Sequence, residues 1–415
     1  MPALSRPMPV TADFTTLERI LEESRSIRGV SLWKDAWRRL KKRTTAMLSL
    51  GSLLILTLLA LLTPLIPLQS PIDKDLRERR LLPPALTPVS MGSRPGLEFV
   101  NHSLTAQLRQ FDSATLSLRR ALDRETDSIK RAGLEASLTM RTSVEHPFNQ
   151  LWYQLDPLSW QLCKVRVAIF GDYAIPSLFG TDMLGRDLLA RVLWGVRVSL
   201  VVGVVATLVS LVIGVSYGAI AGYAGGWLDA LMMRFVDVLY SIPFIFVVIF
   251  LITFLGEDSV KRRLDGIGVN QLMIFYLVIG AIYWLTMSRV VRGQVLSLRH
   301  EQFIEAARTV GAGPARIIVR HIVPNVLGVV IVYLTLTIPS VMLFEAFLSF
   351  LGLGVSPPDV SLGLLLNDGV EALSSVKIFW WVVVFPGATL ALTLFALNFL
   401  GDGVRDALDP RLKNR

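Results

Sequence analysis

Six long apolar blocks constrain the fold of this chain more than any other feature of its sequence. They occupy residues 45–67, 194–217, 232–255, 271–289, 325–345 and 378–400. A helix that crosses a bilayer needs roughly 20 mainly apolar residues, because only closed backbone hydrogen bonding is tolerated in lipid. The sequence therefore predicts an all-α polytopic membrane protein with six transmembrane helices.

Basic residues predict how these spans are oriented. Five of them directly precede the first span: Arg38, Arg39, Lys41, Lys42 and Arg43. The positive-inside rule then places residues 1–44 in the cytoplasm as an N-terminal arm, and six spans return residues 401–415 there as a tail. Within the arm, residues 31–43 have the pattern of an interfacial amphipathic helix. The net charge of +9 is thus explained by topology and contact with lipid headgroups. It does not indicate nucleic-acid binding, because the basic runs form no aromatic stacking platform.

A long polar segment, residues 68–179, separates the first span from the other five. The topology places it outside the cytoplasm, and segments longer than roughly 60 residues translocate largely regardless of their charge. Leucines alternate with arginines between residues 103 and 140, which predicts one or two amphipathic helices. Residues 180–400 then form a core of five spans.

Small residues recur every three or four positions along the second span, and Gly203, Gly214, Gly218 and Gly222 belong to this stripe. Small residues let helices approach closely in lipid. We therefore expect this helix to lie at the centre of the bundle. Prolines 243, 339 and 386 fall in the third, fifth and sixth spans and can kink their helices, although proline is common in membrane helices.

A polar helix-turn-helix pattern lies between the fourth and fifth spans, at about residues 301–324. Glu305-Ala306-Ala307 belongs to the first helix, Gly311 suits a left-handed turn, and Pro314 suits the first turn of the next helix. Pro324 begins the following span. Two small alanines beside a carboxylate form a flat surface that another protein can approach, although the triplet alone would also suit an ordinary helical connector.

This pattern resembles the EAA loop of the ABC importer permeases. Residues 180–200, 347–358 and 401–410 resemble the oligopeptide and dipeptide branch of that family. The resemblance implies the six-helix fold of a type I importer permease, here with a long extracytoplasmic insertion after the first helix, in the bacterial cytoplasmic membrane. It also implies a second permease subunit, two ATPase subunits and an extracytoplasmic binding protein as partners. In that family the loop is the helix that seats in an ATPase subunit, which would give Glu305, Ala306, Ala307, Gly311 and Pro324 a role in coupling.

The chain carries no phosphate-binding loop of its own, because no lysine follows a glycine anywhere in it. We therefore expect this subunit to be non-catalytic and to bind no cofactor, with ATP hydrolysed by its partners. A secondary transporter is the main alternative, and it would need ionisable residues at membrane depth. Asp237 and Glu345 come closest. We expect Asp237 to pair with Arg234 one turn away, and Glu345 to lie near the outer interface.

An intramembrane serine protease is a weaker alternative. Ser216 stands in a Gly-x-Ser-x-Gly pattern, but none of the four histidines falls in a span beside it. His300-Glu301 begins a zinc-protease pattern in which Ile304 replaces the second histidine. Cys163 is the only cysteine, so neither an intrachain disulfide nor a cysteine-based metal site is expected. The residues that line the substrate path cannot be predicted from these patterns.

Overall fold

The computed structural model describes residues 32–77, 79–85, 104–143, 145–152, 155–255, 257–265, 271–355, 359–373 and 377–408. Every regular element in these ranges is helical, apart from one isolated bridge between Thr181 and Asp187. Five helices are long and apolar enough to cross a membrane, and a sixth candidate is a bent pair. The predicted all-α polytopic fold is confirmed over these residues.

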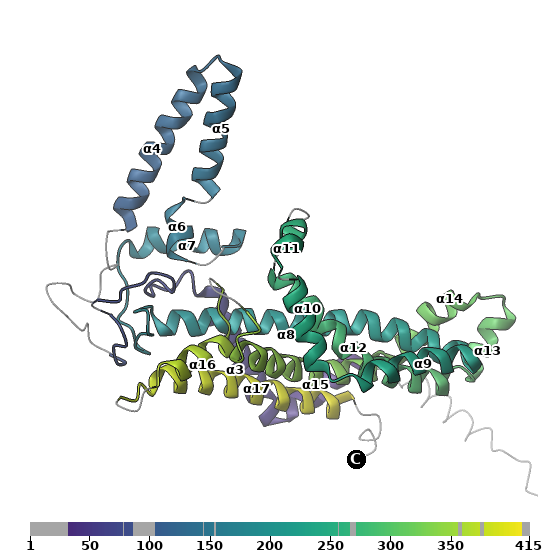
Figure 1. The fold of residues 1–415 in the computed structure, drawn as a ribbon. Coiled ribbons are helices and arrows are strands. Elements are labelled where there is room, and N and C mark those ends of the chain that lie inside the picture. Colours follow the sequence, from purple (N-terminus) through teal and green to yellow (C-terminus); the bar gives the residue numbers. More distant parts are fainter. Residues whose placement is uncertain are drawn as a thin grey trace, which may run out of the picture.

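The single long helices are α3 (Thr44–Leu62), α8 (Leu188–Ala224), α12 (Gln271–Leu298), α15 (Val323–Phe350) and α17 (Trp381–Leu408). They run side by side as one bundle (Figure 1). Helix α8 has 37 residues, about 56 Å, and so exceeds the roughly 30 Å hydrocarbon layer. Its ends therefore extend beyond the membrane. Asp187 caps its start and Gly225, with φ +64°, ends it.

The predicted third span, residues 232–255, is broken. Helices α9 (Gly226–Ser241) and α10 (Phe244–Leu255) meet at 83°. Ile242 is extended and Pro243 follows it, which matches the exclusion of helical backbone before proline. Pro339 and Pro386, by contrast, lie inside α15 and α17, which continue through them. Only the first of the three predicted interruptions separates two helices.

The ends of the chain meet at one end of the bundle. Helix α2 (Leu32–Lys42) is the predicted amphipathic helix, and its Leu40 packs against Ala46 and Ala407. Arg43 forms an ion pair of 2.5 Å with Asp406. The start of α3 and the end of α17 are thus adjacent. Helix α17 extends to Leu408, into the predicted tail.

The predicted helices of the outer segment are present as α4 (Leu104–Arg124) and α5 (Ser128–Ser143). They form a hairpin that projects from the bundle (Figure 1). The short helices α6 (Pro147–Leu151) and α7 (Pro157–Phe170) lie at its base, where Phe111, His146 and Trp160 pack together. Thr105 donates from its amide and hydroxyl to Asp172, at 2.9 and 2.7 Å. These contacts attach the hairpin to α7 and to the residues that flank α6 and α7.

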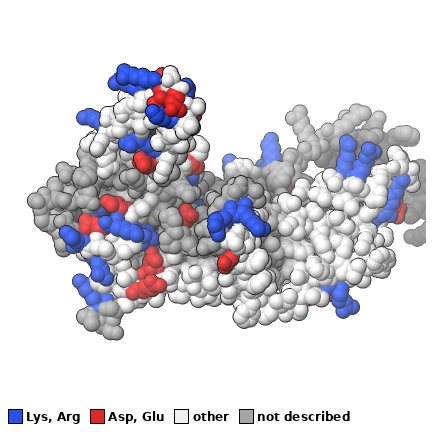
Figure 2. All heavy atoms as spheres, turned by 45° about the horizontal axis from the view of Figure 1, so that its top comes forward, with Lys and Arg blue, Asp and Glu red and all other residues white. Residues whose placement is uncertain are grey.

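The remaining helices lie in connections between spans. Helix α11 (Asp258–Asp265) follows α10, and α16 (Leu362–Glu371) lies between α15 and α17. Helices α13 (Gln302–Thr309) and α14 (Pro314–Ile317) and a π-helical turn, η1 (Ile318–Ile322), connect α12 to α15. In Figure 2 charged side chains gather over the hairpin, at the left, in a central patch and at the right, and a broad uncharged surface lies between the central patch and the right-hand charges. That distribution suits a bundle embedded in lipid.

Candidate functional site

The predicted helix-turn-helix is present as α13 and α14, which we call the docking hairpin. Two hydrogen bonds close α13: the Gly311 amide donates to the Arg308 carbonyl at 2.9 Å, and the Ala312 amide donates to the Ala307 carbonyl at 3.0 Å. Gly311 has φ +87°, so the closure is a Schellman motif that favours glycine. Pro314 begins α14. The turn is therefore defined by backbone hydrogen bonds and by the backbone conformations of Gly311 and Pro314.

Pro324 lies in the first turn of α15, directly after the π-helical turn. A proline inside a helix lacks an amide donor and its ring collides with the carbonyl four residues earlier. A π turn widens the helix at such a point. Helices α14, η1 and α15 therefore form one continuous rod of 37 residues from Pro314 to Phe350. Any movement of the docking hairpin is connected directly to a span.

Three isoleucines fix the docking hairpin to the bundle. Ile304, Ile317 and Ile322 are fully buried in a cluster with residues of α8 and α12: Val215, Ala219, Met287, Val291 and Val295. Burying three such side chains contributes roughly 1.5–3 kcal/mol each. Arg308 also lies over the Tyr223 ring at 5.2 Å. The docking hairpin is therefore packed against the ends of two spans.

The opposite face of α13 is open. Glu305 and Ala306 are exposed, and Ala307 is half-buried against the bundle. Val310 is 89% exposed and Phe303 is 40% exposed, although both are apolar. The two alanines of the predicted triplet are thus not equivalent, because only Ala306 presents an open surface. A charged acceptor beside a small residue and two exposed apolar side chains is a surface suited to a protein partner.

Two ion pairs between α9 and α12 could not be predicted from sequence spacing. Arg292 of α12 binds Asp229 of α9 with two bonds of 2.6 Å. A bidentate pair of this kind fixes orientation as well as distance. Asp237 pairs with Arg289 of α12 at 2.7 Å, and not with Arg234 as expected. Both pairs hold the bent α9–α10 unit to α12.

The glycines of α8 lie at close helix contacts. A methyl group at Gly214 would come within 2.6 Å of Met287 Cβ, at Gly218 within 2.3 Å of the Ser288 carbonyl, and at Gly222 within 2.9 Å of the Arg292 carbonyl. All three face α12. Gly203 instead faces α15, where a methyl group would lie 2.8 Å from Met342 Cγ. Helix α8 therefore contacts two neighbouring spans through its small residues.

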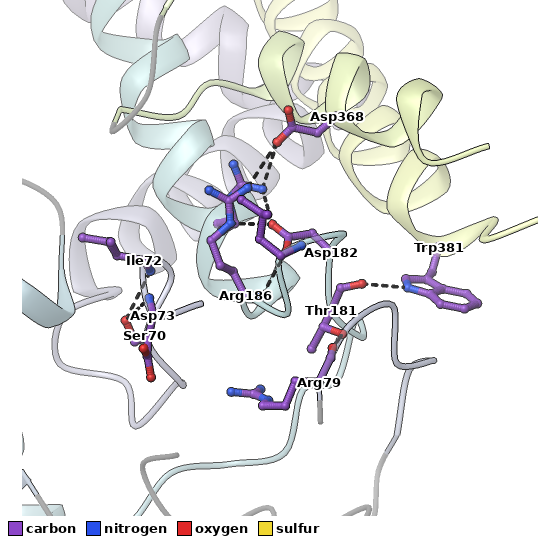
Figure 3. Close-up of polar contacts among 11 residues, drawn as sticks. Ser70, Ile72, Asp73, Arg79, Thr181, Asp182, Arg186, Asp368 and Trp381 are labelled. Carbon is purple, nitrogen blue, oxygen red and sulfur yellow. Dashed lines mark hydrogen bonds and ion pairs between the residues drawn. The ribbon is translucent and has the colours of Figure 1, made fainter. Parts of the chain in front are cut away.

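A buried charge cluster lies at the other end of α8 (Figure 3). Arg191 donates to Asp182 at 2.5 Å and to Asp368 of α16 at 3.0 Å, and Arg186 donates to Asp182 at 2.7 Å. The other oxygen of Asp182 accepts the amides of Leu184 and Arg186 at 2.9 Å. Arg191 is 2% exposed. Sequence reasoning missed this site, although residues 180–191 combine four charges with two glycines at the start of a span.

Asp187 lies beside this cluster and caps α8, accepting the Ala190 amide at 2.7 Å. Burial raises the pKa of its carboxyl from 3.8 to about 6, although hydrogen bonds from Ala190 and Ser177 and the charge of Arg79 oppose that shift. Thr181 accepts the Leu82 amide at 2.8 Å, and its carbonyl accepts the Trp381 indole at 3.2 Å. These bonds connect residues 79–82, the start of α8 and the start of α17.

Glu345 lies inside the bundle, enclosed by side chains of neighbouring helices. It is fully buried, and it accepts hydrogen bonds from Ser199 of α8 at 3.0 Å and Ser349 at 2.7 Å. Ser199 also accepts the Leu362 amide at 3.4 Å, and Ser349 accepts the Val355 amide at 3.2 Å. The carboxylate thus connects α15, α8 and the start of α16.

The features expected of a protease do not come together. Ser216 lies on an exposed face of α8, His146 caps α6, and His300 accepts a hydrogen bond from Arg299 at 2.9 Å. His102 lies outside the described residues. Within the described ranges, no group of three or more histidine, cysteine, aspartate and glutamate side chains could hold a metal ion.

Comparisons with known proteins identify the family of the chain. Residues 214–414 match the family described as binding-protein-dependent transport system inner membrane component. The chain belongs to this family of inner-membrane transport permeases. Residues 31–84 match the N-terminal transmembrane domain of oligopeptide transport permease C, as the resemblance in the sequence predicted.

Several curated relatives of the chain are described as oligopeptide or dipeptide transport system permease proteins. The chain is 48% identical over 233 residues to the oligopeptide transport system permease protein OppC of Haemophilus influenzae, covering 56% of this chain and 70% of the relative. It is 44% identical over 235 residues to the dipeptide transport system permease protein DppC of Bacillus subtilis, covering 57% and 69%. A solved structure of the MetNI methionine ABC transporter in an inward-facing conformation shows a weaker likeness, at 21% identity and TM-score 0.40 over 54% of this chain and 98% of that chain.

Proposed function

We propose that this chain is one permease subunit of an ATP-driven importer of oligopeptides or dipeptides. In this proposal it has the type I importer arrangement, lies in the bacterial cytoplasmic membrane with both termini in the cytoplasm, and forms half of the translocation path. A second, similar permease subunit forms the other half. The family match and the descriptions of OppC and DppC support the substrate class.

Energy enters this subunit at the docking hairpin. The observation that carries this proposal is the contrast between the two faces of α13, because Ile304 is fully buried in the bundle while Ala306 and Val310 are open. Two partner ATPase subunits hold the ATP, and one of them receives this face. Glu305 anchors the contact, Ala306 allows close approach, and Gly311 shapes the turn. Pro324 continues the hairpin into α15.

Substrate arrives from the opposite side of the membrane on an extracytoplasmic binding protein. The α4–α5 hairpin, which neither family match covers, stands on the side of the bundle away from the docking hairpin. We assign to it a contact with that binding protein or with the second permease subunit. Deletion of residues 101–141 should then weaken that association, and unchanged uptake and association would refute the assignment.

The coupling proposal is tested with the assembled transporter in proteoliposomes, by measuring peptide uptake and ATP hydrolysis together. Ala306→Asp places a charge on the open face of α13 and should separate ATPase binding from the permease, lowering uptake at least tenfold. Ala307→Asp should also uncouple transport, and because Ala307 is half-buried, that variant additionally probes the packing of the hairpin. Ala136→Asp is the matched control for ATPase binding and ATP hydrolysis, because Ala136 is an exposed helical alanine on α5, away from the docking hairpin.

Gly311→Val tests the turn independently. A β-branched residue at φ +87° is strained, so α13 should lose its closure while the spans stay inserted. Normal uptake by both Ala306→Asp and Gly311→Val would refute coupling through this hairpin. Uptake driven by an ion gradient without ATPase subunits would instead support a secondary transporter.

A further inference from the structure

A cavity of about 420 Å³ lies at the end of α8 that carries the charge cluster, away from the docking hairpin. We call it the interfacial cavity. Its lining comes from Arg80 and Leu81, from Met183 in the loop before α8, and from five residues at the end of α16 and before α17: Glu371, Ala372, Leu373, Lys377 and Phe379. Its volume is within the range of small-molecule sites. No role assigned so far to this chain uses it.

The lining carries charges of both signs. Arg80 and Lys377 supply two cations, and Glu371 supplies one carboxylate. The Asn367 side chain donates to Glu371 Oε1 at 3.1 Å, which orients that carboxylate. The Lys377 ammonium lies 5.3 Å from the centre of the Phe379 ring. The cavity therefore offers binding groups for a phosphate and for an ammonium group in the same ligand.

The backbone at the cavity is held in an uncommon conformation. Leu81 has φ +51°, and it is the one non-glycine residue with positive φ among those the structure describes. The Leu81 amide donates to the Asp182 carbonyl at 3.0 Å, and the Leu82 amide donates to Thr181 Oγ1 at 2.8 Å. Strained backbone of this kind persists where the surroundings enforce it, and it clusters at binding sites.

The position of the interfacial cavity indicates which ligand it accepts. Phe379 lines it, and α17 begins two residues later at Trp381, so the cavity lies at the head of a membrane span. Ile378 and Trp380, which flank Phe379 in the sequence, are 72% and 50% exposed. Exposed tryptophan at a span end marks the headgroup level of the bilayer. This adjoining apolar surface suits a ligand that carries long apolar chains as well as a charged group.

We propose that the interfacial cavity binds the headgroup of a phospholipid that carries both a phosphate and a primary ammonium, as phosphatidylethanolamine does. Arg80 and Lys377 bind the phosphate, and Glu371 binds the ammonium. The acyl chains run along Ile378, Trp380 and the outer face of α17. This inference is independent of the proposed coupling and substrate class, because it depends only on where the cavity lies in the bilayer.

Lipid retention by the full transporter complex tests the proposal. The complex is purified in detergent, stripped of lipid, and titrated with phosphatidylethanolamine or phosphatidylglycerol, and bound lipid is counted by native mass spectrometry. Wild type should retain one phosphatidylethanolamine per copy of this chain at least tenfold more tightly than phosphatidylglycerol. Lys377→Ala and Arg80→Ala should each weaken that retention about tenfold. Arg77→Ala, an exposed arginine three residues from Arg80, is the matched control and should change nothing.

Glu371→Gln distinguishes the headgroup from any anionic lipid. This variant has the same shape without the charge, so it should lose the preference for phosphatidylethanolamine while phosphatidylglycerol binds as well or better. A melting-temperature shift of the wild-type complex, larger with phosphatidylethanolamine than with phosphatidylglycerol, tests the same preference without a variant. Equal retention of the two lipids by wild type would overturn the proposal. So would displacement of the lipid by a dipeptide, or an equal loss in Arg77→Ala.

Discussion

Replacement of Gly218 by alanine tests whether α8 and α12 can pack closely only because residue 218 has no side chain. The added methyl carbon would lie 2.3 Å from the Ser288 carbonyl oxygen and 3.0 Å from Val291 Cβ. Ordinary contact begins near 3.4 Å, so the helices would have to separate by about 1 Å along this contact. The nearest atom belongs to backbone, which cannot rotate away as a side chain can. Overpacking of this kind costs about 1–3 kcal/mol.

Gly293→Ala is the matched control, because Gly293 lies in α12 and a methyl group there meets nothing within 4 Å. Alanine is favoured over glycine inside a helix by about 1 kcal/mol, so this variant should be neutral or slightly more stable. The two substitutions add the same atom to the same helix pair and should have opposite effects. Thermal unfolding of the purified protein in detergent measures both. Equal melting temperatures for Gly218→Ala and Gly293→Ala would show that the packing argument is wrong.

Three further predictions concern buried polar groups. Arg191→Met should destabilise the protein by about 3–5 kcal/mol in the same assay, since it leaves Asp182 buried with one cation fewer, and a loss below 1 kcal/mol would contradict this. Because the pKa of Asp187 is raised to about 6, its native form binds a proton more readily than the unfolded form, so its contribution to stability is greatest below pH 4 and falls as pH rises through 6. Asp187→Asn, which keeps the cap, should remove that fall, worth about 2 kcal/mol, from an unfolding series between pH 4.5 and 7.5. Glu345→Gln should be tolerated better than Glu345→Leu, as measured by yield of folded protein, because only glutamine can still accept from Ser199.

The number of spans and their helical structure could be predicted because each span corresponds to one contiguous run of apolar residues in the sequence. Their ends could not be placed from hydropathy alone. Helix α8 begins six residues before the predicted span and ends seven residues after it, since Asp187 and Gly225 determine its ends and neither is apolar. Hydropathy also treated residues 232–255 as one span, whereas the extended conformation before Pro243 turns the chain through 83°.

The turn of the docking hairpin was predictable for a similar reason. Gly311 and Pro314 act through their own backbone, so their positions in the sequence are sufficient. The charge cluster was not predictable, because Arg191 and Asp368 are 177 residues apart. The partners of Glu345 could not be predicted for the same reason. A buried carboxylate is stable only with donors, and Ser199, which supplies one, is on another helix.

The continuity of α8 connects these two distant sites and leads to a further prediction. One unbroken helix carries Arg191 of the charge cluster at its start and Val215 and Ala219 of the docking-hairpin cluster near its end. Four glycines let it pack closely against α12 and α15. A packed helix without a break transmits displacement as a rigid body, whereas the joint at Pro243 can change its angle. Nucleotide binding should therefore leave the length of α8 unchanged and alter the angle between α9 and α10.

Electron spin distance measurements on the assembled transporter can separate these responses, because Cys163 is buried and is the only native cysteine. One label pair spans α8 at Val201 and Ile220, and a second spans the joint at Leu231 and Phe250; all four side chains are exposed. Addition of a non-hydrolysable ATP analogue should leave the first distance within 1 Å and shift the second by several ångströms, on the scale of hinge motions. A change in the first distance with a constant second distance would mean that α8 itself bends. The docking hairpin and the charge cluster would then not be coupled by a rigid helix.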